Sequence, residues 1–103
     1  SSSILGSGEL ANQKTISANT TLDNTYNGAI VKVKATATIT IPTGLATNFN
    51  CVFDVWAGVT ATFALSGGAT IDSSTGTTLT AGKMATLYQD SSTNVYRLKG
   101  ELL

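Results

Sequence analysis

A strict alternation of threonine with apolar residues over 35–41 constrains the fold of this chain most. The segment reads Ala-Thr-Ala-Thr-Ile-Thr-Ile. A period of two places the apolar side chains on one face of a β-strand and the threonines on the other face. Since no segment shows the period of an amphipathic helix, the sequence predicts an all-β protein.

Short β-branched or alternating segments recur along the rest of the chain, separated by Gly, Pro, Ser and Asn. The turn at Ala57-Gly58 predicts a hairpin, and the last two segments form the final strand pair. Turns at this spacing predict a compact antiparallel β-sandwich or jelly-roll-like barrel rather than a solenoid with a fixed repeat. The expected strands are 30–34, 35–41, 50–56, 59–65, 69–72, 77–79, 84–89 and 94–99.

The length of 103 residues fits one domain, which we place at 14–103. Residues 1–13 are expected to form an extended N-terminal arm, because their few apolar side chains cannot build a core. Exposed apolar residues in an arm favour contact with a neighbouring subunit, and a solvated tail is the alternative. The expected interface residues are Ile4, Leu5 and Leu10 in the arm and Leu102 and Leu103 at the other end, where end fraying is the alternative.

The composition argues against catalysis. The chain has no histidine, and its six acidic residues are more than ten positions apart, so we expect no enzyme, cofactor or metal site. Lys32 and Lys34 form a closely spaced basic pair, which is too little positive charge for nucleic-acid binding. No apolar run approaches the ~18 residues of a membrane span, so no membrane partner is expected. The formal net charge of zero favours self-association, and Cys51 reads as a buried core thiol.

Two surface features remain as alternatives. Trp56 is able to stack on a sugar ring, although a Trp on a strand more often belongs to a core or a subunit interface. The threonines of 36–40 and 60–62 form a pattern also found in proteins that bind ice, but a solvated strand face is the preferred interpretation.

Several segments, in order, resemble a small β domain that recurs in tailed-phage virion proteins, in tail fibres and in capsid fibres or decoration proteins. The resemblance covers 14–103, with Tyr96 standing where Trp is expected. It implies a homotrimer without catalytic residues of its own. The segments that carry it are Thr21-Leu22-Asp23, Gly28-Ala29-Ile30-Val31, Thr38-Ile39-Thr40-Ile41-Pro42, Val59-Thr60-Ala61-Thr62-Phe63, Gly68-Ala69-Thr70-Ile71, the run Leu79 to Leu87, and Val95-Tyr96-Arg97-Leu98-Lys99-Gly100.

The resemblance leaves two roles open. The first is a capsid decoration (cement) protein on the capsid exterior, made in the host cytoplasm, which binds the major capsid protein and braces the shell. The short chain favours this role, because a fibre also needs a long shaft. The alternative is a tail-fibre C-terminal or receptor-binding domain, in which Trp56, Tyr88 or Tyr96 would stack on host surface polysaccharide.

Overall fold

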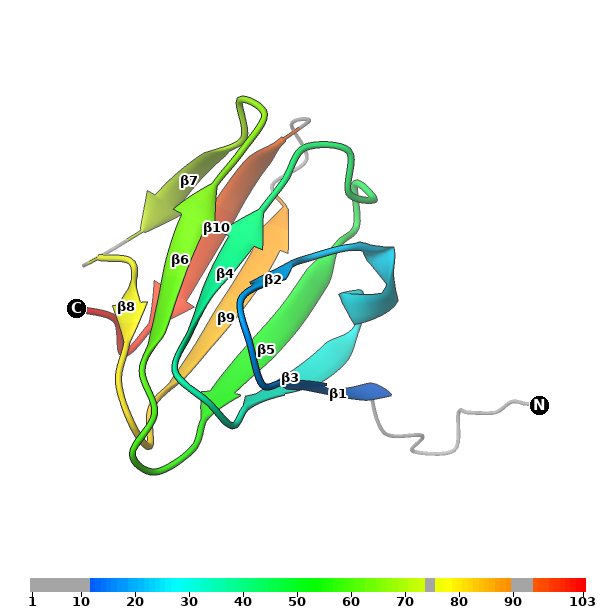
Figure 1. Cartoon of the computed structure of the whole chain (residues 1–103). Coiled ribbons are helices and arrows are strands. Elements are labelled where there is room, and N and C mark those ends of the chain that lie inside the picture. Colours follow the sequence, from blue (N-terminus) through cyan, green and yellow to red (C-terminus); the bar gives the residue numbers. More distant parts are fainter. Residues whose placement is uncertain (1–11, 74–75, 90–93) are drawn as a thin grey trace.

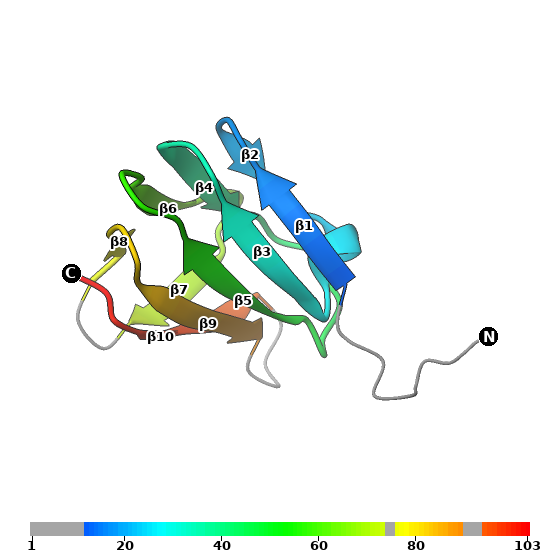
Figure 2. The same ribbon diagram turned by 90° about the horizontal axis from the view of Figure 1, so that it is seen from below.

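The computed structural model describes residues 12–73, 76–89 and 94–103, and it places ten strands in two facing sheets (Figure 1). The all-β prediction is therefore confirmed, and Figure 2 shows the sheets as two layers. A 3-10 turn, η1 (Asn24–Tyr26), is the only helical segment in the described part of the chain. Sheet A contains, in spatial order, β1 (Asn12–Ile16), β3 (Ala29–Val33), β5 (Asn50–Val55), β9 (Met84–Gln89), β10 (Val95–Gly100) and β7 (Thr70–Ser73). Sheet B contains β2 (Thr20–Thr21), β4 (Ala37–Ile41), β6 (Ala61–Leu65) and β8 (Thr78–Leu79).

The first six strands follow a β-solenoid path. The chain passes from sheet A to sheet B and back, so that β1, β3 and β5 lie in sheet A and β2, β4 and β6 lie in sheet B. Each strand pairs in parallel with the preceding strand of its own sheet, for example Val31 with Phe53 and Ile39 with Phe63. Residues 12–65 thus make three turns of a two-sheeted solenoid.

The remaining strands close the stack in a different way. β9 pairs antiparallel with β5, β10 pairs antiparallel with β9, and β7 joins the far side of β10 in parallel. On the other sheet β8 pairs antiparallel with β6. The hairpin of β9 and β10 confirms the expected final strand pair.

The prediction of antiparallel strands is wrong for the first three turns, and so is the hairpin at Ala57-Gly58, since β5 and β6 belong to different sheets. The sequence has no fixed repeat, and a fixed repeat is the pattern expected of a solenoid. The turns do differ in length: Asn12 pairs with Ala29, 17 residues on, whereas Ala29 pairs with Cys51, 22 residues on. A solenoid with unequal turns leaves no constant period.

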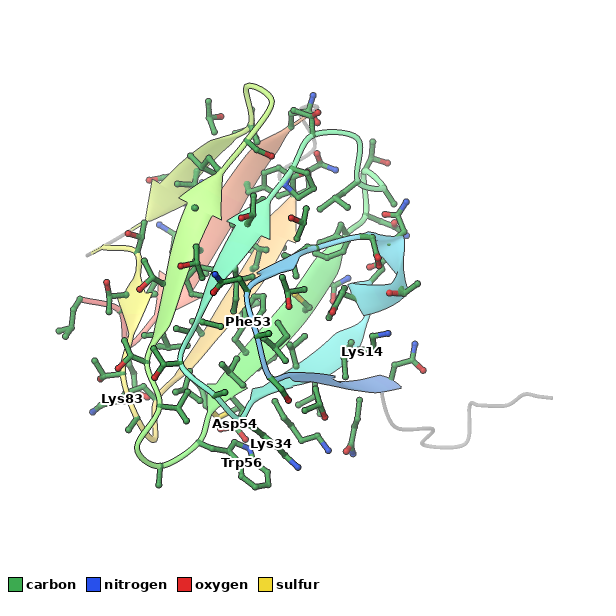
Figure 3. All side chains as sticks on the ribbon, viewed as in Figure 1. Lys14, Lys34, Phe53, Asp54, Trp56 and Lys83 are labelled. Atoms are coloured by element: carbon green, nitrogen blue, oxygen red, sulfur yellow. The ribbon has the colours of Figure 1, made fainter. Side chains whose placement is uncertain are left out.

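The core lies between the sheets and follows the alternation of the strands. β3, β4 and β5 each bury every second residue. Because partners in register share a face, these residues form continuous stacks across the sheets. The Phe53 ring from sheet A, labelled in Figure 3, meets the Phe63 ring from sheet B edge to face, and the two ring centroids are 4.9 Å apart.

The expected boundary of the arm needs one correction. Asn12 and Gln13 are the first two residues of β1 and pair with Ala29 and Ile30, because their backbone continues the sheet A ladder. The rest of the predicted arm, including Ile4, Leu5 and Leu10, lies outside the described residues.

Candidate functional site

The outer face of sheet A, which we call face A, carries most of the exposed large apolar side chains. Trp56, Met84 and Tyr88 are 45%, 47% and 38% exposed, and the other two in the described residues, Leu65 and Leu103, lie elsewhere. Alternation places these three on one side, since Met84 and Tyr88 are outward residues of β9, and Trp56 continues the outward set of β5. Face A comprises Gln13, Thr15, Ile30, Lys32, Lys34, Asn50, Val52, Asp54, Trp56, Thr70, Asp72, Met84, Thr86, Tyr88, Val95, Arg97 and Lys99.

The strand register joins the apolar residues of face A into a band. Ile30 lies opposite Val52, and Val52 lies opposite Thr86 at the middle of β9. Met84 and Tyr88 flank Thr86 on the same side of β9. Adjacent strands in a sheet are about 4.8 Å apart, so neighbouring members of this band are within side-chain reach.

One end of the band carries a cation stacked on an indole. The ammonium of Lys34 lies 4.3 Å from the centroid of the Trp56 ring, and Figure 3 shows both beside Asp54 at the end of β5. A cation over an aromatic face contributes about 0.5–1 kcal/mol at exposed sites. This contact therefore favours one orientation of the indole ring but stabilises the fold only slightly. Lys32 lies opposite Asp54 in the register and also donates to the side-chain oxygen of Gln13 at 3.2 Å.

The other end of face A holds a three-residue ion cluster. Arg97 Nε lies 3.2 Å and Lys99 Nζ 3.9 Å from the same carboxylate oxygen of Asp72. Tyr88 lies opposite Arg97 across the strand pair. In total, face A carries Lys32, Lys34, Arg97 and Lys99 against the carboxylates of Asp54 and Asp72, so it has a positive excess.

The outer face of sheet B, which we call face B, has a different character. Its outward residues are threonine and alanine, and Thr38, Thr62 and Thr78 lie in one row across β4, β6 and β8. Leu103 extends this row, because it and Thr78 exchange two backbone hydrogen bonds, at 2.8 and 3.3 Å, and such partners point to the same side. Face B comprises Thr21, Thr38, Thr40, Thr62, Ala64, Thr78 and Leu103.

The predicted interface residues at the end of the chain separate. Leu102 is buried at 4% exposure, whereas Leu103 is 70% exposed on face B. Burial makes Leu102 part of the core, so only Leu103 is available to a partner. Ile4, Leu5 and Leu10 lie outside the described residues, and their role stays a prediction.

Two of the three predicted stacking aromatics, Trp56 and Tyr88, are exposed on face A, but the third is not available. Tyr96 is fully buried, and its hydroxyl donates to the carbonyl oxygen of Pro42 at 3.0 Å. The expectation that Tyr96 stacks on a glycan is therefore wrong. Tyr96 lies on the inward side of β10, where burial raises the pKa of its phenol.

Buried Gln89 fixes the longest connection between the sheets, residues 42–49. Its side-chain amide donates to the carbonyl oxygens of Leu45 and Ala46 at 3.2 and 2.5 Å. Its side-chain oxygen accepts from the backbone N–H of Asn94 at 2.7 Å. With the Tyr96–Pro42 contact, these bonds satisfy buried polar groups and give Gln89 a structural role.

The described residues contain no detected pocket and no group of three or more potential metal ligands. None of the helical structure in this part of the chain is long and apolar enough to cross a bilayer. The candidate functional surfaces are thus the two open sheet faces. The apolar part of face A includes Met84, which the sequence analysis did not single out, although the alternation of 84–89 places it beside Tyr88.

The Cys51 thiol is buried in the core, as expected, and burial raises its pKa to about 12. In the unfolded chain the thiol ionises near 9, so the folded state holds the proton more tightly between these two pKa values. Stability from this group is therefore complete below about pH 9 and is lost as the pH rises toward 12.

Between neutral pH and about pH 10.5, we expect the free energy of unfolding of the wild type to fall by about 2 kcal/mol more than that of Cys51→Val. This pH is about 1.5 units above the thiol pKa of the unfolded chain, and each unit corresponds to about 1.4 kcal/mol. Urea unfolding of both proteins at each pH measures this. Tyrosine ionisation affects both proteins equally, so the difference between their losses of stability reports the ionisation of the Cys51 thiol alone. Equal losses in the two proteins would contradict the prediction.

Comparison of the chain with protein-family models, with curated proteins and with solved structures gives no match.

Proposed function

We propose that this chain is a non-enzymatic structural protein of a tailed-phage virion, a trimeric capsid decoration (cement) protein that braces the shell from the outside. The observation that carries the proposal is face A, on which Trp56, Met84 and Tyr88 are all exposed on the same side of one sheet. The segments that resemble phage virion domains support the same role. The protein would be made in the host cytoplasm and would bind the major capsid protein.

The residue types on face A suit a protein partner. Trp, Tyr, Met and Arg are enriched at protein interfaces, and Trp, Tyr and Arg dominate their binding energy. Face A has six strands of up to six residues, which gives about 24 by 20 Å, or about 500 Å² in projection. This is of the same order as the roughly 800 Å² of accessible surface that each partner buries in a standard interface.

The proposed action is mechanical. Each bound copy adds contacts to the capsid subunits beneath it, and a ligand that binds only the assembled shell stabilises that shell by mass action. The positive excess of face A favours an acidic patch on the capsid, since complementary charge speeds association and selects the partner. Ile4, Leu5 and Leu10 of the arm would grip a neighbouring subunit.

The test is binding to capsids that lack this protein, measured by co-sedimentation. We expect the double variant Trp56→Ala/Tyr88→Ala to bind at least about thirty-fold more weakly, because truncating one interface hot spot costs about 2 kcal/mol. Leu65→Ala, which shortens an equally exposed apolar residue away from face A, is the matched control and should bind normally.

Removal of residues 1–11 leaves β1 intact and tests the arm in the same assay. We expect the shortened protein to remain folded and to lose capsid binding. Full binding by the shortened protein would refute the role of the arm, and unchanged binding by the double variant would refute docking through face A.

A second candidate function is supported by the exposed aromatics themselves. Trp56 and Tyr88 lie on the same face, and each has a basic neighbour, Lys34 or Arg97. Aromatic rings beside hydrogen-bond donors are also a way to hold sugars. A tail-fibre or receptor-binding domain would thus bind host surface polysaccharide through this face. Retention on a glycan array together with no binding to capsids would favour this function over capsid decoration.

A further inference from the structure

The charged side chains of the described residues are divided unequally between the two outer faces. Face A carries six of them, four basic and two acidic, whereas face B carries none. The others lie elsewhere: Lys14 on β1 above the Tyr26 ring, Asp23 at the start of η1, and Lys83 paired with Glu101 beside β9. The two outer faces therefore differ, since six of the 17 residues of face A are charged and none of the seven residues of face B is.

Depletion of charge is the main compositional signal of an interface core. Covering face B removes only hydroxyl and methyl groups and one leucine side chain from water, so no charged side chain has to be desolvated. Threonine is β-branched and already restricted in its side-chain torsion, so little conformational entropy is lost on contact. Face B is therefore the sheet face that costs least to cover.

The chemistry of face B also makes it complementary to itself. A threonine hydroxyl both donates and accepts a hydrogen bond, so two copies of a threonine row satisfy each other in register. A two-fold axis brings two identical patches together, whereas around a three-fold axis one part of the patch meets another part of the same patch on the neighbouring copy. A patch without charged side chains avoids repulsion in both arrangements. Face A, with its positive excess, would repel its own copy.

Leu103 adds an apolar anchor to this face. It is 70% exposed and continues the row of Thr38, Thr62 and Thr78 at the edge of sheet B. In Figure 1 the end of the chain lies directly beside β8. An exposed leucine gains free energy when a partner covers it.

We propose that face B is the homotypic interface of this protein, so that the faces B of neighbouring copies meet around the axis of a homo-oligomer with Leu103 at the rim of the contact. This inference deepens the proposed function and rests on it only for the expectation of a homo-oligomer. It leaves face A pointing away from the axis and free for the larger partner. Face B has four strands of up to five residues, which gives about 14 by 17 Å, or about 240 Å² in projection. This is less than the ~800 Å² per partner of a standard interface, so assembly should depend on protein concentration.

The test is the oligomeric mass of the full chain, measured by sedimentation velocity over a wide range of concentration. Thr62→Lys places a charge at the centre of face B, and Thr86→Lys places the same charge at the centre of face A. Both threonines are exposed, and each lies inside a strand that has a neighbour on either side, so the pair is matched. We expect the wild type and Thr86→Lys to assemble and Thr62→Lys to remain a monomer.

Leu103→Ser is the second variant, since it adds no charge to a strand, and it should weaken assembly at least ten-fold. Circular dichroism confirms that each variant is folded. A wild type that stays monomeric at every concentration, assembly of Thr62→Lys like the wild type, or loss of assembly in Thr86→Lys would each overturn the proposal. Thermal hysteresis of a monomeric wild type that Thr62→Lys abolishes would instead assign face B to ice.

The outcome is separate from that of the capsid assay. No capsid is present in the sedimentation experiment, so a failed virion role leaves its result readable. Conversely, capsid binding by a monomeric Thr62→Lys would keep the docking role of face A and confine face B to self-association.

Discussion

Replacement of Phe53 by alanine is expected to lower the free energy of unfolding by about 3–5 kcal/mol, the largest effect of any single side-chain truncation considered for this protein. Phe53 is fully buried in β5, and its ring is 4.9 Å from that of Phe63 in β6. The contact joins sheet A to sheet B, so its loss leaves a cavity between the two layers. Urea unfolding followed by circular dichroism measures the change.

Two variants separate volume from aromatic geometry. Phe53→Leu keeps most of the apolar volume and should cost less than the alanine variant. The double variant Phe53→Ala/Phe63→Ala should cost less than the sum of the single variants, by about 0.5–1.5 kcal/mol, because the pair is already broken by either change. A loss under about 1 kcal/mol for Phe53→Ala would show that the sheets do not depend on this contact.

The positions of β3 to β10 could be predicted from the sequence because alternation marks which residues face the core, whereas β1 and β2 were not predicted. In 37–41 the alternating apolar residues are buried, and in 84–89 the buried set is Ala85, Leu87 and Gln89, whereas Met84 and Tyr88 face outward. Gly and Asn at the turns mark where strands end. These signals are local, so they need no knowledge of the partner strand.

The direction of pairing could not be predicted, because parallel and antiparallel neighbours need the same alternation. The Ala57-Gly58 turn looks like a hairpin turn, yet the chain there crosses from β5 in sheet A to β6 in sheet B. The connections between the sheets range from three residues at 34–36 to eight at 42–49. Unequal connections hide the solenoid repeat, since each turn advances by a different number of residues.

The exposed residues were predicted only in part, because the sequence does not show which side of each strand faces the core. Tyr88 is an outward residue of β9, but Tyr96 in β10 points inward and bonds to Pro42. Only the register distinguishes the two tyrosines. The neutrality of face B emerges only once β4, β6 and β8 are known to share a sheet, because their threonines are far apart in the sequence.

The second large effect is expected for Gly100→Ala, which should lower the free energy of unfolding by about 3 kcal/mol or more. Gly100 has a φ of +146°, a region that other residues avoid at a cost of about 1–3 kcal/mol. A Cβ atom there would lie 2.5 Å from the carbonyl oxygen of Met84 and 2.6 Å from the Cα of Ala85. Backbone atoms cannot turn aside as a side chain does, so β10 must move away from β9.

The matched control for this change is Gly82→Ala. Gly82 also has a positive φ, +78°, but a Cβ atom there meets nothing within 4 Å. Gly82→Ala should therefore lower the free energy of unfolding only by the backbone strain, about 1 kcal/mol. The difference in this free energy between the two variants measures the clash at Met84 and Ala85. A shift of β9 would also displace Met84 and Tyr88, so Gly100→Ala should weaken docking through face A while Gly82→Ala does not. Equal stability of the two variants in urea would show that β9 and β10 do not approach as closely as the ladder between them requires.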